Sequence, residues 1–219
     1  SIQVPGNWET QGFGNAIYLD ERYPFETKWP NAPTEHNPTG FYRKLIELPA
    51  SWQDKQVFFH IGAARSSLTL YINGKEVGYS QGAKTPAEFD ISAYLKPGKN
   101  LLAMQIIRWS DASYLESQDM LRMSGIERDV YLYATPKQRI EDIAFTQQLN
   151  ASLDSARLDI SLNTVNNEDK KASLKGTLAV MFGYNVGGIL IPSDIPPRLI
   201  PAKEAKPPNF DAAPPVSEV

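Results

Sequence analysis

The sequence predicts an all-β fold whose N-terminal part is an antiparallel β-sandwich. Between residues 41 and 136, short segments rich in β-branched and aromatic residues follow one another, and turn signals separate them. The only helix-like piece, residues 91–95, is too short to anchor a fold. Short strands at this spacing are typical of sandwiches, and the long returns between them favour a jelly roll.

The first forty residues are predicted to be mostly irregular, because proline at their density removes hydrogen-bond donors. Strands are then expected over Phe41–Leu48, Val57–Ile61, Leu68–Ile72, Glu76–Tyr79, Asn100–Arg108 and Asp129–Tyr133. Asn73-Gly74 lies between two of these strands. It is a strong two-residue hairpin signal, since both residues tolerate a positive φ.

After Thr135-Pro136 the pattern changes, and three further strands are predicted over Ile140–Gln148, Arg157–Asn163 and Ala172–Met181. Arg157–Asn163 alternates strictly between polar and apolar residues, which predicts one buried and one wet face. Residues 183–219 are rich in proline and predict an extended or disordered tail. Within it, residues 189–191 could add one edge strand.

Composition excludes several classes of function. The 219 residues suffice for one or two domains with a sizeable core. With 22 basic and 25 acidic residues, the net charge is −3. The chain therefore lacks the excess of positive charge that is typical of proteins that bind nucleic acid. No apolar run is long enough for a transmembrane helix. The absence of cysteine excludes disulfides and thiolate metal sites, but it leaves the compartment, cytoplasmic or periplasmic, open.

Residues 108–130 connect two predicted strands and form a loop that is unusually long. Charged residues of both signs alternate there with Trp109, Tyr114, Met120 and Met123. Such a loop has too many apolar residues for a solvated linker and is predicted to be ordered. Its carboxylates suit a surface that faces another domain or a polar ligand.

This loop closely resembles the corresponding stretch of the large bacterial β-galactosidases of glycoside hydrolase family 2. The matching positions are Arg108-Trp109-Ser110-Asp111, Ser113-Tyr114-Leu115-Glu116, Gln118-Asp119-Met120, Arg122-Met123-Ser124-Gly125-Ile126 and Arg128-Asp129-Val130. The resemblance implies a galactose-binding-like jelly roll over residues 1–136. It also implies a partial immunoglobulin-like β-sandwich over residues 137–182, since three strands are fewer than the roughly seven of a complete one. The tail, residues 183–219, departs from the family.

The resemblance further implies the N-terminal fragment of a retaining β-galactosidase. Such a fragment would buttress the catalytic barrel of the same chain and help to form its sugar pocket. Magnesium and sodium are the ions of the intact parent, which is expected to be a homo-oligomer. The catalytic glutamates of the family lie on the barrel, so no catalytic residue is assigned here and the chain alone is expected to be inactive.

Two aspartates are candidate substrate-binding residues. Asp111 matches the aspartate that, in the family, contacts the galactosyl group and helps to hold sodium together with barrel residues. Asp20 falls where the best-known members carry an asparagine that touches substrate. Aspartate accepts hydrogen bonds but cannot donate them, so its contact would differ. The alternative for Asp111 is a turn-capping role.

The other polar residues carry weaker hypotheses. The loop's remaining carboxylates are predicted to order it, because three arginines nearby would keep them ionised. His36 and His60 have no partner at ligand spacing, so no metal site follows. Two alternatives remain for the whole chain: a free-standing carbohydrate-binding module and a purely structural interaction domain. A β-glucuronidase or β-mannosidase parent is disfavoured by the loop's match to the β-galactosidases.

Overall fold

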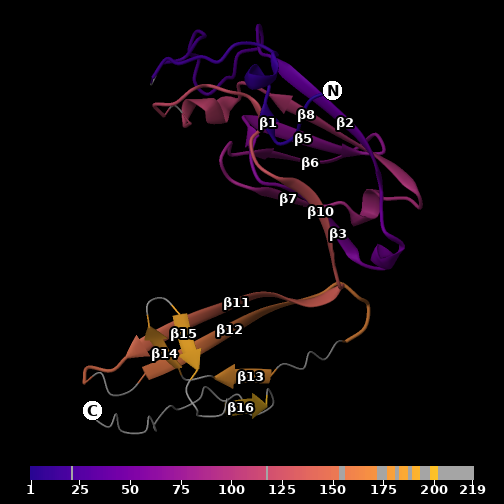
Figure 1. The fold of residues 1–219 in the computed structure, drawn as a ribbon. Coiled ribbons are helices and arrows are strands. Elements are labelled where there is room, and N and C mark those ends of the chain that lie inside the picture. The colour runs from indigo at the N-terminus through magenta and orange to yellow at the C-terminus, as the bar shows by residue number, and fades with distance from the viewer. Residues whose placement is uncertain are drawn as a thin grey trace. The chain divides into compact units, whose positions relative to one another are not determined.

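The computed structural model describes residues 1–20, 22–116, 118–152, 156–171, 177–180, 183–186, 189–192 and 198–201. The chain divides into two compact units, Ser1–Pro136 (unit 1) and Lys137–Val219 (unit 2) (Figure 1). The regular structure of the described residues consists of β-strands and four 3₁₀ helices, which confirms the all-β prediction. None of the helices in this part of the chain is long and apolar enough to cross a membrane.

Unit 1 contains a four-stranded and a three-stranded antiparallel sheet. The first has the order β2-β8-β5-β6, with bounds Thr39–Glu47, Lys99–Ile107, Ser67–Ile72 and Lys75–Gln81. The second has the order β10-β3-β7, with bounds Val130–Thr135, Gln56–Ile61 and Ala87–Asp90. A third, small sheet joins β1 (Gly6–Asn7), β9 (Gly125–Ile126) and β4 (Ala64–Arg65).

The core of unit 1 lies between the two larger sheets. Because side chains alternate along a strand, β3, β5 and β8 each turn every second residue inward. The buried residues of these strands are Val57, Phe59, Ile61, Leu68, Leu70, Ile72, Leu102, Met104 and Ile106, and they belong to one cluster. Two antiparallel sheets packed over a shared apolar layer form a β-sandwich, as the sequence predicts.

Local signals in the sequence set several of the connections. The hairpin between β5 and β6 turns at Asn73 and Gly74, with φ of 53° and 82°. The helix-like piece is a 3₁₀ helix, η3 (Ser92–Tyr94). Two more 3₁₀ helices, η1 (Glu9–Gln11) and η2 (Ala50–Trp52), lie in the N-terminal half of the unit.

The described part of unit 2 contains three strand pairs. β11 (Gln138–Leu149) pairs with β12 (Ala156–Asn166), β13 (Thr177–Val180) with β16 (Arg198–Pro201), and β14 (Gly183–Val186) with β15 (Ile189–Pro192). The last pair includes the expected edge strand at residues 189–191. β13 covers residues 177–180 of the strand predicted over 172–181. The other residues of that prediction, and most of the predicted tail, lie outside the described residues.

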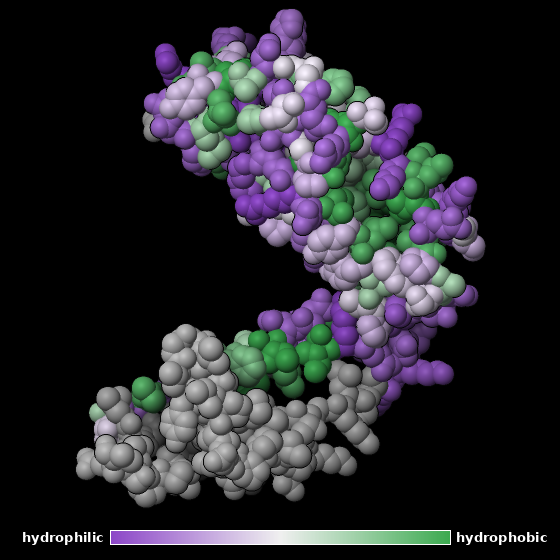
Figure 2. Space-filling view, viewed as in Figure 1, coloured by the Kyte–Doolittle hydropathy of each residue, from purple (hydrophilic) through white to green (hydrophobic). Residues whose placement is uncertain are grey.

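The β11–β12 pair exposes apolar side chains on one face. Ile143 and Leu162 are direct cross-strand partners, Phe145 lies two residues along, and all three are exposed. Figure 2 shows hydrophobic side chains along these strands. The predicted buried face of Arg157–Asn163 is found only in part: Leu158 and Ile160 are half-buried, but Leu162 is 56% exposed. Among the described residues, β12 pairs with β11 alone, and a two-stranded ribbon cannot enclose a core.

Candidate functional site

The long loop between β8 and β10 is ordered from its first turn. It begins with the 3₁₀ helix η4 (Asp111–Tyr114), whose N-terminus carries a capping box formed by Ser110 and Ser113. The Ser110 amide donates to Ser113 Oγ at 3.0 Å, and Ser66 Oγ donates to Ser110 Oγ at 2.7 Å. The serine of the Arg-Trp-Ser-Asp motif thus fixes the turn on which Asp111 stands.

Two buried arginines fasten the loop to the N-terminal segment. Arg108 donates through Nη2 to the carbonyl oxygens of Asn15 and Arg122, at 3.0 and 2.8 Å. Arg122 donates through Nη1 to the Glu116 carbonyl at 2.7 Å and through Nη2 to the Asp20 carbonyl at 2.6 Å. A single guanidinium therefore joins the segment that carries Asp20 to the end of the turn that carries Asp111.

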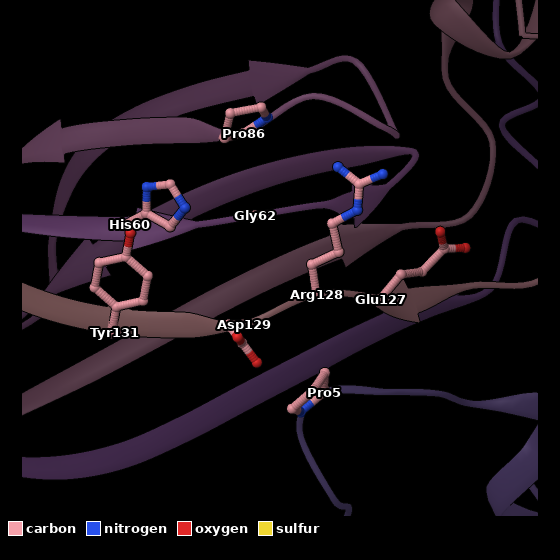
Figure 3. Close-up of a pocket in the computed structure, with 8 residues that line it drawn as sticks. All are labelled: Pro5, His60, Gly62, Pro86, Glu127, Arg128, Asp129 and Tyr131. Carbon is pink, nitrogen blue, oxygen red and sulfur yellow. The ribbon is translucent and has the colours of Figure 1, made fainter. Parts of the chain in front are cut away.

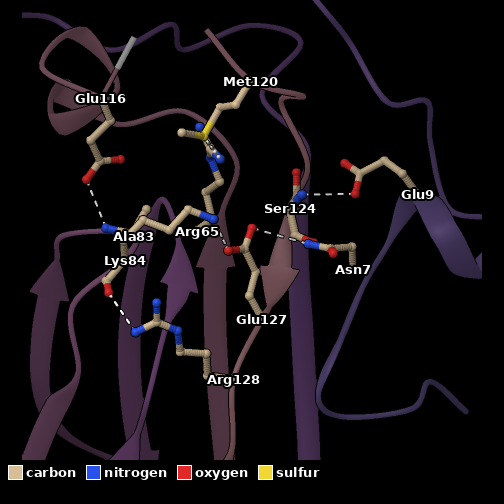
Figure 4. Close-up of polar contacts among 10 residues, drawn as sticks. All are labelled: Asn7, Glu9, Arg65, Ala83, Lys84, Glu116, Met120, Ser124, Glu127 and Arg128. Carbon is tan, nitrogen blue, oxygen red and sulfur yellow. Dashed lines mark hydrogen bonds and ion pairs between the residues drawn. The ribbon is translucent and has the colours of Figure 1, made fainter. Parts of the chain in front are cut away.

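A third arginine, Arg65, lies buried among the loop's carboxylates (Figure 4). Burial lowers its pKa, and the nearby charge of Glu127 works in the opposite direction. Glu127 also accepts a hydrogen bond from Asn7 and forms an ion pair with Lys84. Glu116 accepts the Ala83 amide at 2.8 Å. These contacts hold the two glutamates in structural roles.

Aromatic rings pin the irregular N-terminal segment onto the loop. Tyr114 is buried, and the ring of Trp29 stacks on it with centroids 4.1 Å apart. The Tyr114 hydroxyl donates to the Asn31 carbonyl at 2.8 Å, while the Tyr23 hydroxyl donates to the Tyr114 carbonyl at 2.7 Å. The segment is therefore rigid enough to present Asp20 at a defined place.

Asp111 is exposed at the start of η4. Its Oδ1 accepts the Ala112 amide at 3.0 Å, which is the turn-capping role considered from the sequence. The same oxygen accepts a hydrogen bond from Gln81 Nε2, at the end of β6. Both bonds orient the carboxylate, and the side chain is still open to solvent on a fixed turn. Capping and ligand binding are thus compatible at this residue.

Asp20 is also exposed, with φ of 54°, and only its carbonyl oxygen is engaged by Arg122. Two residues earlier, the Tyr18 hydroxyl donates to Asp119 Oδ1. This hydrogen bond, together with the charges of Asp119 and Asp20, raises the pKa of Tyr18. Two carboxylates thus lie within electrostatic reach of one phenol on this part of the surface.

Sequence reasoning missed Gln81, and it did not predict that Arg122 binds the Asp20 carbonyl. Gln81 lies 30 residues from Asp111, and Arg122 lies 102 residues from Asp20, so no local pattern reveals either contact. Large apolar side chains on the same segments are exposed rather than buried. They are Phe13, Tyr18, Trp29, Leu115 and Leu121. Asp20 and Asp111 therefore stand on segments with an apolar surface that suits a partner.

Metal ligands are sparse in the part of the chain that the structure describes, which holds no group of three or more histidine and acidic side chains able to bind an ion. Asp111 offers a hard oxygen, the donor type that sodium and magnesium prefer. One carboxylate is too few for either ion. The described residues alone thus do not make the sodium site that the resemblance implies.

His60 has a partner that sequence spacing did not reveal. It lies opposite Glu88 in the β3–β7 register, and His60 Nδ1 is 2.8 Å from Glu88 Oε1. On the neighbouring strand β10, Tyr131 stacks against the imidazole with centroids 4.4 Å apart. Cross-strand neighbours far apart in sequence create this pair.

Residues 1–136 match the family model described as "Glycosyl hydrolases family 2, sugar binding domain". The chain belongs to this family, as the resemblance of its sequence indicates.

The chain is also similar to individual glycosidases, both in sequence and in structure. The chain is 42% identical over 170 residues to a β-galactosidase of Priestia megaterium and 45% identical over 163 residues to one of Enterobacter cloacae. These matches cover 76% and 74% of the chain, which spans 16% of each relative's length. The crystal structure of a Bacteroides uniformis β-glucuronidase is similar with a TM-score of 0.57 at 28% identity, over 82% of this chain and 20% of that one.

Proposed function

We propose that this chain is the non-catalytic N-terminal part of a β-galactosidase. In the intact enzyme it packs against the catalytic barrel and completes one wall of the sugar pocket. The whole enzyme hydrolyses terminal β-D-galactosides. The parent is proposed to be a β-galactosidase rather than a β-glucuronidase because the named β-galactosidases are 42% and 45% identical to the chain, against 28% for the glucuronidase.

The observation that carries the proposal is the presentation of Asp111. Its carboxylate is exposed, yet Gln81 and the Ala112 amide orient it, and the turn beneath it is capped. An ionised carboxylate in a fixed position accepts strong hydrogen bonds from sugar hydroxyls. Asp20 stands on a segment that Arg122 ties to the same loop, so it can contribute a second acceptor.

The apolar side chains on these segments supply the second argument. Leu115, directly after η4, is 80% exposed, and Trp29 and Tyr18 are also open to solvent. Rings and aliphatic chains at a rigid surface are typical of an interface core. The barrel of the same chain is the proposed occupant. There Asp111, with barrel ligands, could also contribute one oxygen to a sodium ion, while magnesium is proposed to bind elsewhere in the parent.

A chimera tests the proposal. The matched 170 residues of the Priestia megaterium β-galactosidase are replaced by the corresponding residues of this chain, and kcat/KM is measured on an aryl β-galactoside. Asp111→Ala removes a charged hydrogen-bond acceptor for the sugar, worth about 1.5–3 kcal/mol, so kcat/KM should fall about 10- to 100-fold. Glu76→Ala, an exposed carboxylate on β6, is the matched control and should leave kcat/KM unchanged.

The chain alone should show no turnover of the same substrate, because glycoside hydrolysis needs a positioned pair of carboxyl groups. Turnover by the isolated chain would contradict the non-catalytic role. An Asp111→Ala chimera with unchanged kinetics would instead support a purely structural interaction domain.

A further inference from the structure

A cavity on unit 1, lined in part by the C-terminal end of the loop that carries Asp111 but not by Asp111 or Asp20, has the chemistry of a small-ligand site. It has a volume of about 550 Å³ and is lined by Pro5, His60, Gly62, Pro86, Glu127, Arg128, Asp129 and Tyr131. This volume is within the range of small-molecule pockets. Figure 3 shows His60 and Tyr131 on one side, Arg128 and Glu127 on the other, and Pro86 and Pro5 at opposite edges.

The apolar part of this cavity is an aromatic wall. Tyr131 is 48% exposed although its ring stacks on His60. His60 Nδ1 is engaged by Glu88, which fixes the imidazole plane and hence the phenol ring against it. A rigid, half-exposed ring presents flat apolar area at little entropic cost to a ligand.

The polar part offers free hydrogen-bonding groups. Asp129 is exposed, and its carboxylate has no hydrogen-bond partner among the described residues. Its carbonyl oxygen accepts the Gly62 amide at 2.9 Å, so the backbone beneath it is fixed. Arg128 uses Nη1 on the Lys84 carbonyl at 3.1 Å, which leaves the rest of the guanidinium able to donate.

The charges at the cavity sum to about zero. Glu127 is paired with Lys84, and the lining adds one cation, Arg128, and one carboxylate, Asp129. Such a cavity does not favour an anion or a cation, but it offers acceptors and donors together. The ligand that fits is neutral, has several hydroxyl groups and has one apolar face, which describes a hexopyranose.

We propose that this cavity is a second carbohydrate site, in which the apolar face of a neutral hexopyranose lies on Tyr131 and its hydroxyls bind Asp129 and Arg128. The site is complete within unit 1 and needs no catalytic barrel. It is therefore independent of the role proposed for Asp111, and it gives the carbohydrate-binding-module hypothesis a definite location.

The test is a titration of the full 219-residue chain with methyl β-D-galactopyranoside, monitored by two-dimensional amide NMR. Millimolar binding is expected, with shifts centred on residues 60 and 128–131. Tyr131→Ala should weaken binding about tenfold. Asp129→Asn, which keeps the shape of the side chain, should weaken it as well, and serves if the tyrosine variant fails to fold.

Two controls locate the effect. Phe41→Ala removes a ring that is 70% exposed on β2, outside the cavity, and should leave the affinity unchanged. Asp111→Ala distinguishes the cavity from the Asp111 surface. The absence of saturable shifts would overturn the proposal. So would binding that survives Tyr131→Ala and Asp129→Asn but is lost in Asp111→Ala, which would assign the sugar to the Asp111 surface instead. Methyl β-D-glucuronide tests the neutrality argument and should bind more weakly.

Discussion

Replacing Arg122 should weaken unit 1 more than any exposed substitution in the loop. Its two side-chain hydrogen bonds, to the Glu116 and Asp20 carbonyls, come from a charged donor and are worth about 1.5–3 kcal/mol each. Loss of both gives about 3–6 kcal/mol. Part of this is offset, because Arg122 lowers the pKa of buried Arg65 through like-charge repulsion, which its removal relieves. A net destabilisation of about 3 kcal/mol is expected for Arg122→Met.

Urea unfolding followed by tryptophan fluorescence measures this effect in the right unit. The chain has four tryptophans, at positions 8, 29, 52 and 109, and all lie in unit 1. Arg122→Met should also lower the thermal midpoint by about 10 °C. Arg122→Lys is the matched control: it keeps the charge and can satisfy one carbonyl, so about half the loss is expected.

The order of the variants is the critical result. The reasoning is wrong if Arg122→Met lies within about 1 kcal/mol of the wild type, or if Arg122→Lys is less stable than Arg122→Met. Either outcome would mean that the hydrogen bonds to the carbonyls do not offset the desolvation cost of burying the guanidinium.

Three further predictions concern single residues of unit 1. Gly40→Ala should cost about 1–3 kcal/mol in urea unfolding, because its Cβ would stand 2.3 Å from the buried ring of Trp8. Asn100→Ala should cost about 2–3 kcal/mol in the same assay, since the fully buried amide accepts the Lys96 amide hydrogen and donates to two carbonyls. Asp119→Asn should lower the pKa of Tyr18 in a phenolate absorbance titration, with Tyr18→Phe used to assign the signal. The raised pKa stabilises the fold below the unfolded value of about 10, and this contribution is lost as pH rises through the folded pKa.

The strands of unit 1 could be predicted because their burial alternates. The predicted strand over Val57–Ile61 differs from β3 by one residue, and the prediction over Leu68–Ile72 differs equally little from β5. β7 was missed, since its four residues include two carboxylates and follow a proline. The two-residue strands β4 and β9 have no sequence signature. They exist because the ordered loop pairs with a distant segment.

The candidate site was only half predictable. The motif singled out Asp111 because its neighbours recur as a block, and the structure shows why that block is needed: Ser110 and Ser113 cap the turn. The partners that orient the acidic residues come from other elements, Gln81 from β6 and Arg122 from far along the chain. Cross-strand and cross-loop contacts depend on tertiary packing, so a single sequence does not contain them in readable form.

The exposed apolar face of the β11–β12 pair has a practical consequence. Ile143, Phe145 and Leu162 form a contiguous apolar strip on the β11–β12 hairpin, which pairs with no further strand among the described residues. Purified at high concentration, the chain should self-associate through this strip, and a charge placed at Leu162 should keep it monomeric in analytical ultracentrifugation. Binding titrations therefore gain from that substitution, which lies outside unit 1.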